Sequence, residues 1–112
     1  MATVAYLDID QGSDFNVELN LENDDGTPML LGDYEVYSQF RKSYSSTIGY
    51  TFTTAIEDVT NGKISLTYLG EDSSNIKPGR YLYDIELVHI TGRKIRVVEG
   101  IVTINPEITK IP

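Results

Sequence analysis

From Pro78 to Ile104, hydrophobic and polar residues alternate along the chain with the two-residue period of a half-buried β-strand. A tight turn predicted at Thr91-Gly92-Arg93 divides this stretch into two strands, and the second strand alternates less regularly. The predicted inward-facing residues are Tyr81, Tyr83, Ile85, Leu87, Val98, Val102 and Ile104. Because a two-stranded hairpin is marginally stable alone in water, this pattern also requires further strands against its hydrophobic face.

Shorter segments with the same alternation lie along the rest of the chain. They are residues 3–9, 15–21, 34–41, 50–56 and 64–68, with a short hydrophobic segment at 28–31. Asn61-Gly62 is the strongest hairpin signal, typical of a type I′ turn in which both central residues have positive φ. The polar connection at residues 70–77 leaves room for one helical turn from Ser73. No segment has a sustained helical period.

These segments predict an all-β protein, an immunoglobulin-like antiparallel β-sandwich of about seven to eight strands. We expect the sandwich to cover residues 1–105 and a short extended C-terminal tail to cover residues 106–112, because the prolines of the tail cannot continue a central strand. Tyr81 follows a tight turn at Gly79-Arg80, which is the position of the tyrosine in a tyrosine corner. The cysteine pair and the tryptophan of antibody domains are missing, so the core must be stable through packing alone.

The composition limits the partners that the domain can have. Its 112 residues suffice for one domain with a single core. Nine basic residues among seventeen acidic ones give a net charge of −8, which argues against a nucleic-acid partner. No hydrophobic run reaches the length of a membrane span, and the N-terminus lacks the basic and apolar regions of a secretory signal. We therefore expect a soluble protein with neither a nucleic-acid nor a membrane partner.

Few residues are suited to catalysis or metal binding. His89 is the one histidine, and no cluster with metal-ligand spacing accompanies it in the sequence. Asn23-Asp24-Asp25-Gly26 could offer oxygen ligands to calcium, but turn preference explains the same residue types, and the further ligands of a calcium loop are missing. Asp8 and Asp10 share one face of a strand, where they could serve hydrolysis or line a solvated edge. We expect no catalytic residue, no metal site, no cofactor and no enzymatic activity.

A binding surface is better supported by the sequence than catalysis is. Tyr37, Tyr44 and Tyr50 surround a polar loop that also carries Arg41 and Lys42, and both tyrosine and arginine are enriched at interfaces. The same tyrosines could instead border the core with their hydroxyl groups in water. The two readings use the same amphipathic property, so the sequence leaves both open.

The first predicted strand, residues 3–9, is hydrophobic on both of its faces. Ala5, Leu7 and Ile9 fall on one face, and Val4 and Tyr6 on the other. Such a strand is either covered on both sides within the domain or meets a partner subunit.

Several motifs together resemble a known group of proteins. The segments LDIDQGSDF, DDGTPMLLGDYEVYSQFRKSYSS, NGKISLTYL, KPGRYLYDIEL and RVVEGIVTINPEITK are similar to small tailed-phage virion proteins, and to the immunoglobulin-like N-terminal domain of phage baseplate upper proteins. The matching positions are Asp25-Gly26, Leu31, Gly32, Asn61-Gly62, Pro78-Gly79, Tyr81, Asp84, Glu86 and Glu99-Gly100. The resemblance covers nearly the whole chain, and its motifs consist of turn and core residues.

This resemblance implies a non-enzymatic structural protein of the virion, assembled in the host cytoplasm. It implies a tail, baseplate or neck adaptor that contacts other virion proteins and forms a homo-oligomer within the particle. The alternatives are a capsid decoration protein and a carbohydrate- or receptor-binding module that uses the tyrosine-rich loop. The sequence ends soon after the sandwich, unlike the larger baseplate proteins, which leaves room for an adaptor or a decoration protein. We expect neighbouring subunits at the first strand, the short proline-bearing tail and exposed strand edges. The candidate interface residues are Val4, Tyr6, Tyr37, Arg41, Tyr44, Tyr50, Ile108 and Ile111.

Overall fold

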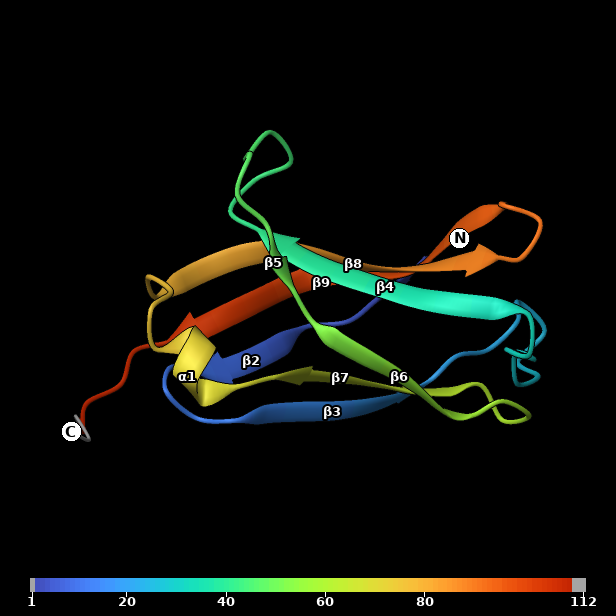
Figure 1. The fold of residues 1–112 in the computed structure, drawn as a ribbon, viewed down its shortest axis with the longest axis horizontal. Helices are drawn as coiled ribbons and strands as arrows, with labels where there is room; N and C mark the ends of the chain where they lie inside the picture. Colours follow the sequence, from blue (N-terminus) through green and yellow to red (C-terminus); the bar gives the residue numbers. More distant parts are fainter. Residues whose placement is uncertain (1, 110–112) are drawn as a thin grey trace.

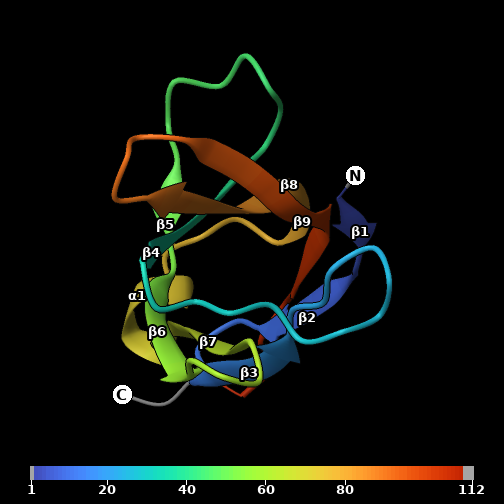
Figure 2. The same ribbon diagram turned by 90° about the vertical axis from the view of Figure 1, so that its right-hand side faces the viewer.

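The computed structural model describes residues 2–109, which form two β-sheets packed face to face (Figure 1 and Figure 2). The larger sheet contains β1 (Thr3–Val4), β2 (Leu7–Asp10), β4 (Tyr34–Arg41), β5 (Tyr50–Thr51), β8 (Gly79–His89) and β9 (Lys94–Asn105). The smaller sheet contains β3 (Phe15–Asn20), β6 (Thr53–Asp58) and β7 (Lys63–Tyr68). A short helix, α1 (Gly70–Ser73), connects β7 to β8, and no helix within residues 2–109 is long and apolar enough to cross a membrane.

The arrangement of strands confirms the predicted immunoglobulin-like β-sandwich. The order is β1-β9-β8-β4-β5 in the larger sheet, where β2 also pairs with β9, and β3-β7-β6 in the smaller sheet. β1 and β2 run parallel to β9, whereas the other strand pairs are antiparallel. Thr3 lies opposite Val98 and Leu7 opposite Val102, so β1 and β2 follow β9 in one register. They are therefore the single predicted first strand, interrupted at residues 5 and 6.

The predicted strand at residues 50–56 is also divided in two, at Phe52. β5 pairs with β4 in the larger sheet, while β6 pairs with β7 in the smaller one. The Phe52 side chain is buried, and its backbone N–H donates a hydrogen bond to the Ser38 carbonyl oxygen at 3.0 Å. The chain thus crosses from one sheet to the other without breaking its inward–outward alternation, which is why the pattern indicated one strand.

The long hairpin of β8 and β9 forms as predicted, with Gly92 at positive φ (92°) in its turn. Ile85 lies opposite Val98 but Glu86 lies opposite Arg96, so β9 carries one extra residue, Val97. This β-bulge shifts the phase of the side chains by one position. It explains why hydrophobic and polar residues alternate less regularly in β9 than in β8.

The hairpin between β6 and β7 forms as predicted, but its turn is not of type I′. No non-glycine residue within residues 2–109 has positive φ, which excludes the conformation that a type I′ turn requires of Asn61. Gly62 has a positive φ of 68°. The Asp58 carboxylate accepts hydrogen bonds from the backbone N–H groups of Thr60 and Asn61, each at 3.1 Å, and closes a longer loop. The carboxylate at the strand end therefore decides the turn type.

The predicted helical turn is corrected in its position. The helical turn begins at Gly70 rather than at Ser73, because the Gly70 N–H donates to a carboxylate oxygen of Asp14 at 2.8 Å and fixes the start of α1. Residues 28–31 form no strand, and Pro28 makes only an isolated bridge with Glu22. In contrast, the turn at residues 23–26 is confirmed, since the Gly26 N–H donates to the Asn23 carbonyl oxygen at 2.9 Å.

Aromatic rings from both sheets meet at one end of the core. Phe40 is fully buried, and the ring centroids of Tyr50, Phe52, Tyr68 and Tyr81 lie 5.1 to 5.7 Å from its own. Aliphatic side chains fill the rest of the space between the sheets. The other large side chains with almost no exposure are Ile9, Leu31, Ile64, Leu66, Ile76, Ile85, Leu87, Val102 and Ile104.

The predicted tyrosine corner is confirmed at the start of β8. The Tyr81 hydroxyl group donates a hydrogen bond to the Lys77 carbonyl oxygen at 2.6 Å, four residues upstream. We expect Tyr81→Phe to lower the free energy of unfolding by about 1–2 kcal/mol, because the Lys77 carbonyl oxygen loses its partner in a partly buried site. Urea unfolding monitored by circular dichroism measures this change. Tyr34→Phe is the control, since the Tyr34 hydroxyl makes only an exposed 3.4 Å contact with Arg93, and an equal loss in both variants would contradict the assignment.

Candidate functional site

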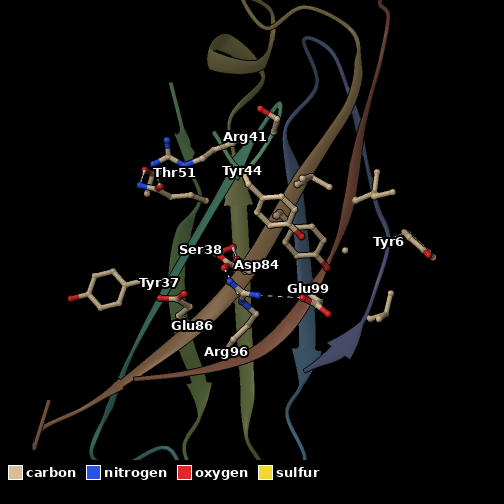
Figure 3. Close-up of a pocket in the computed structure, with 17 residues that line it drawn as sticks. Tyr6, Tyr37, Ser38, Arg41, Tyr44, Thr51, Asp84, Glu86, Arg96 and Glu99 are labelled. Carbon is tan, nitrogen blue, oxygen red and sulfur yellow. Dashed lines mark hydrogen bonds and ion pairs between the residues drawn. The ribbon is translucent and has the colours of Figure 1, made fainter. Parts of the chain in front are cut away.

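A groove of about 530 Å³ crosses the outer face of the larger sheet (Figure 3). The term outer face is used here for the side chains of β4, β8 and β9 that point away from the core and line this groove. They are Tyr37, Gln39, Arg41, Leu82, Asp84, Glu86, Arg96, Glu99 and Ile101. Five of the eight residues predicted at an interface line this groove, namely Val4, Tyr6, Tyr37, Arg41 and Tyr44. The fold therefore brings together residues from the first strand, β4 and the following loop.

The alternation of β4 explains why these side chains face outward. Val36, Ser38 and Phe40 are buried, which leaves Tyr37 and Gln39 on the opposite face of the strand. Cross-strand pairing then extends this face over β8, where Tyr37 lies opposite Glu86. Ser38 fits its inward position because its hydroxyl group donates to the Asp84 carbonyl oxygen at 2.6 Å.

An ion-pair cluster forms the floor of the groove. The Arg96 guanidinium lies 3.2 Å from the Asp84 carboxylate and 3.5 Å from the Glu99 carboxylate. Figure 3 shows Tyr37 and Tyr6 on opposite sides of this cluster. These charges are half-exposed, so they contribute little to stability but place both signs of charge within one surface.

The loop at residues 42–49 projects from the sheet between β4 and β5 (Figure 1). It presents Tyr44, which lines the groove and is 83% exposed. Arg41 anchors the base of this loop by donating to the Ser46 carbonyl oxygen and to the Gln39 side-chain oxygen, each at 2.9 Å. Gly49 packs against the same guanidinium, since a Cβ at this position would lie 2.8 Å from Arg41 Cζ. Arg41 thus supports the loop as well as lining the groove.

Tyr37 carries a hydrogen bond that changes its acidity. Its hydroxyl group donates to the Glu35 carboxylate at 2.5 Å. This hydrogen bond, together with the negative charge of Glu35, raises the pKa of the Tyr37 hydroxyl above its usual value. The ring therefore remains a neutral, half-exposed aromatic surface at the end of the groove.

The opposite wall of the groove depends on the break between β1 and β2. The Ala5 carbonyl oxygen lies outside the β-ladder between the first strand and β9. It lies against Gly100 and accepts a hydrogen bond from the Tyr83 hydroxyl group at 2.8 Å. The Ala5 N–H still donates to the Glu99 carbonyl oxygen at 2.9 Å. This arrangement leaves Tyr6 largely exposed at the rim of the groove.

The buried Tyr83 hydroxyl predicts how stability changes at high pH. Burial raises its pKa from 10.0 to about 12, so the folded protein holds this proton over a range in which an unfolded tyrosine loses it. The free energy of unfolding should therefore fall as the pH rises from about 10 to about 12, and the contribution is fully present below pH 10. Urea titrations across this range should show a smaller fall for Tyr83→Phe than for the wild type. The two proteins differ only at residue 83, so identical pH profiles would contradict the proposed role of Tyr83.

Three of the predicted interface residues do not join the groove. Tyr50 packs against Phe40 in the aromatic end of the core, with ring centroids 5.1 Å apart, so it borders the core instead of pairing with Tyr44. Ile108 lies in the tail and is exposed, away from the residues that line the groove. Ile111 lies outside the described residues.

The residues considered for chemistry lie on exposed surfaces. His89 ends β8, where its Nδ1 atom hydrogen-bonds the Thr91 hydroxyl at 2.9 Å. Asp8 and Asp10 both point outward from β2. Asp25 hydrogen-bonds the backbone and side chain of Thr27, which lowers its pKa and occupies the carboxylate within the turn. Within residues 2–109, no three side chains of the metal-binding types converge on one point.

The floor of the groove was not predicted from the sequence. Leu82 and Ile101 lie opposite each other on β8 and β9, in positions that alternation assigns to the solvent side. Hydrophobic residues within an otherwise polar outward row were the available signal. The charged residues of the floor gave no such signal, because exposed charges are typical of any strand.

No protein-family model and no curated protein matches the sequence. Among solved structures, the chain resembles an internalin-like protein of Listeria monocytogenes with a TM-score of 0.48 and 18% identity, over 93% of this chain and 28% of the other. It also resembles the Lin-41 filamin domain, with a TM-score of 0.48 and 18% identity over 88% and 82% of the two chains. AggA, the major subunit of aggregative adherence fimbriae type I from Escherichia coli, gives a TM-score of 0.44 and 10% identity over 93% and 91%. This chain thus spans less than a third of the internalin-like protein, and likeness at this level carries no information on function.

Proposed function

We propose that this protein is a non-enzymatic structural subunit of a tailed-phage virion, placed in the tail, baseplate or neck. The phage assignment rests on the sequence resemblance across nearly the whole chain. The observation that carries the assembly role is the groove on the outer face, where Val4, Tyr6, Tyr37, Arg41 and Tyr44 meet. Its partners would be other virion proteins.

The two outer surfaces of the sandwich differ in a way that supports assembly through the larger sheet. On the smaller sheet, outward groups such as Asn16 and Thr67 hydrogen-bond each other at 2.8 Å and are polar, as is usual for a surface in water. On the larger sheet, Tyr6 is 71% exposed and Tyr37 is 53% exposed beside the groove. Exposed aromatic and aliphatic groups that gather over a groove are typical of protein interfaces.

The location in the particle tests this proposal. Particles purified from the virus whose genome carries this sequence should contain the chain in stoichiometric amount by mass spectrometry. Antibody labelling in the electron microscope should then mark the tail, the baseplate or the neck. Labelling of the head would instead favour the alternative of a capsid decoration protein. A chain that stays in the soluble lysate, with none in purified particles, would contradict both.

A carbohydrate- or receptor-binding module is the second candidate, because Tyr44 does stand exposed over the groove. Aromatic rings beside carboxylates and an arginine can stack on a sugar and hydrogen-bond its hydroxyl groups. Binding on a glycan array that Tyr44→Ala abolishes, and that Ile90→Ala leaves unchanged, would favour this function. Ile90 is 78% exposed and lies outside the groove, so it controls for the loss of an exposed hydrophobic group. An array without binding would count against it.

A further inference from the structure

The outer face is self-complementary about the line between β8 and β9. Its cross-strand neighbours form successive rows across these two strands, with Leu82 opposite Ile101 in one row and Glu86 opposite Arg96 two rows further on. A twofold axis parallel to the strands, between two such faces, would lay β8 of one copy on β9 of the other. Each row would then meet its own copy with the two members exchanged, as an isologous interface requires.

We propose that a second copy of this chain occupies the groove, through an isologous, face-to-face contact of the two larger sheets. This inference rests on the proposed assembly role and names the partner at the same surface. In the contact, Leu82 meets Ile101 of the second copy, which joins two hydrophobic groups at the centre. Glu86 meets Arg96 of the second copy, which joins opposite charges.

The row between these two contains the like charges Asp84 and Glu99. The axis brings Asp84 of one copy to Glu99 of the other, which would repel if both were unpaired. Each copy supplies its own Arg96 between them, at 3.2 Å from Asp84 and 3.5 Å from Glu99. Arg96 carries one positive charge and the two carboxylates carry two negative ones, so the internal ion pairs offset part of the repulsion in this row and leave a net charge of −1 in each copy.

The margins of the sheet have opposite charges that the same axis would superimpose. Arg80 on β8 lies opposite Thr103 on β9, and Thr103 lies opposite Asp8 on β2, so the three residues share one row. Exchange of the strands places Arg80 over Thr103 of the second copy, next to Asp8 of that copy. Each dimer contains this contact twice.

The size of the face suits a dimer. β8 has 11 residues, so at about 3.3 Å per residue it extends about 36 Å. Five strands about 4.8 Å apart span about 24 Å. The face is therefore at most about 860 Å², close to the roughly 800 Å² that each partner buries in an interface of standard size. Sheets packed face to face keep their strand directions within about 30° of each other, so an axis parallel to the strands is compatible with this kind of packing.

Sedimentation velocity of the full chain at near-physiological salt tests the contact through an exchange of charges. The wild type should be mainly dimeric at about 100 µM. Asp8→Lys and Arg80→Glu should each weaken dimerisation about tenfold, because each places like charges together twice per dimer. The double variant Asp8→Lys/Arg80→Glu has the wild-type net charge and should dimerise within about threefold of the wild type.

Glu18→Lys is the matched control, since it makes the same charge change on an exposed position of the smaller sheet and should leave dimerisation intact. Leu82→Glu should abolish the dimer, with its fold checked by circular dichroism. A wild type that is monomeric at about 500 µM, or single and double variants that lose affinity additively, would overturn the proposal. If the chain is monomeric in solution but present in particles, the dimer proposal is contradicted and the virion role is supported. If the chain is dimeric in solution but absent from particles, the virion role is contradicted and the dimer proposal is supported.

Discussion

Phe40→Ala is expected to lower the free energy of unfolding by about 3–5 kcal/mol, the largest loss that we expect from any single truncation in this domain. Phe40 is fully buried, and four aromatic rings lie within 5.7 Å of its centroid. Those rings come from β5, β7, β8 and the crossing residue Phe52, so the cavity would lie where both sheets meet. The melting temperature should fall by roughly 10–20 °C, as measured by differential scanning calorimetry.

Tyr44→Ala is the control for this prediction, because it also removes an aromatic ring but from an exposed position. Its effect on the free energy of unfolding should stay within about 0.5 kcal/mol. If Phe40→Ala lowered the free energy of unfolding no more than Tyr44→Ala does, the aromatic end of the core would not be the main packing contact between the sheets.

Gly100→Ala is expected to have the second-largest effect and to lower the free energy of unfolding by about 2–3 kcal/mol. A Cβ at this position would lie 1.9 Å from the Ala5 carbonyl oxygen, which is backbone and cannot rotate away. Relief requires residues 2–6 to move off β9, and this movement breaks the hydrogen bond between Tyr83 and Ala5. Hydrogen exchange should therefore show faster exchange at the Ala5 amide, which donates to the Glu99 carbonyl oxygen in the wild type.

Gly32→Ala is the matched control, since a Cβ there would meet only Val59 Cγ1 at an ordinary 3.7 Å. It should leave both the unfolding free energy and the exchange at Ala5 unchanged within error. Gly100→Ala should also weaken self-association, because Val4 and Tyr6 would no longer form the wall of the groove. Wild-type exchange at Ala5 in Gly100→Ala would contradict the close approach of the first strand to β9.

The strands could be predicted from the sequence wherever one face is buried and the other is wet. β4 was predicted at its observed bounds, Tyr34–Arg41, because burial of alternate residues leaves a two-residue period in the sequence. The same reasoning placed β8 and β9 and the tyrosine corner. These features depend on neighbours a few residues away, or on one face of one strand.

The features that the sequence did not predict depend on contacts between distant residues. The break in the first strand follows from the Tyr83 hydroxyl and the small Gly100, far along the chain from Ala5. Likewise, Phe52 keeps the alternation while the chain changes sheets, so periodicity could not locate the crossing. Tyr50 and Tyr44 have similar surroundings in the sequence, yet Tyr50 packs against the core and Tyr44 is exposed.

The candidate site was predicted only in part, because part of it also depends on contacts between residues distant in the sequence. Val4 and Tyr6 predicted either a strand covered on both sides or a contact with a partner subunit, and the structure leaves both side chains exposed at the groove. The floor of the groove joins Asp84, Arg96 and Glu99 from two strands, and the bulge at Val97 sets which side chains of β9 face outward. That register could be known only once the strands were paired.

We propose that this protein assembles in the virion through the outer face of the larger sheet. Hydroxyl-radical footprinting tests it most directly, by comparing intact particles with the free chain diluted to the monomer. We predict that Tyr6, Tyr37 and Tyr44 are protected in particles, while Ile90, exposed and outside the groove, reacts equally in both. Equal reactivity of the three tyrosines in particles and in the free chain would contradict the claim.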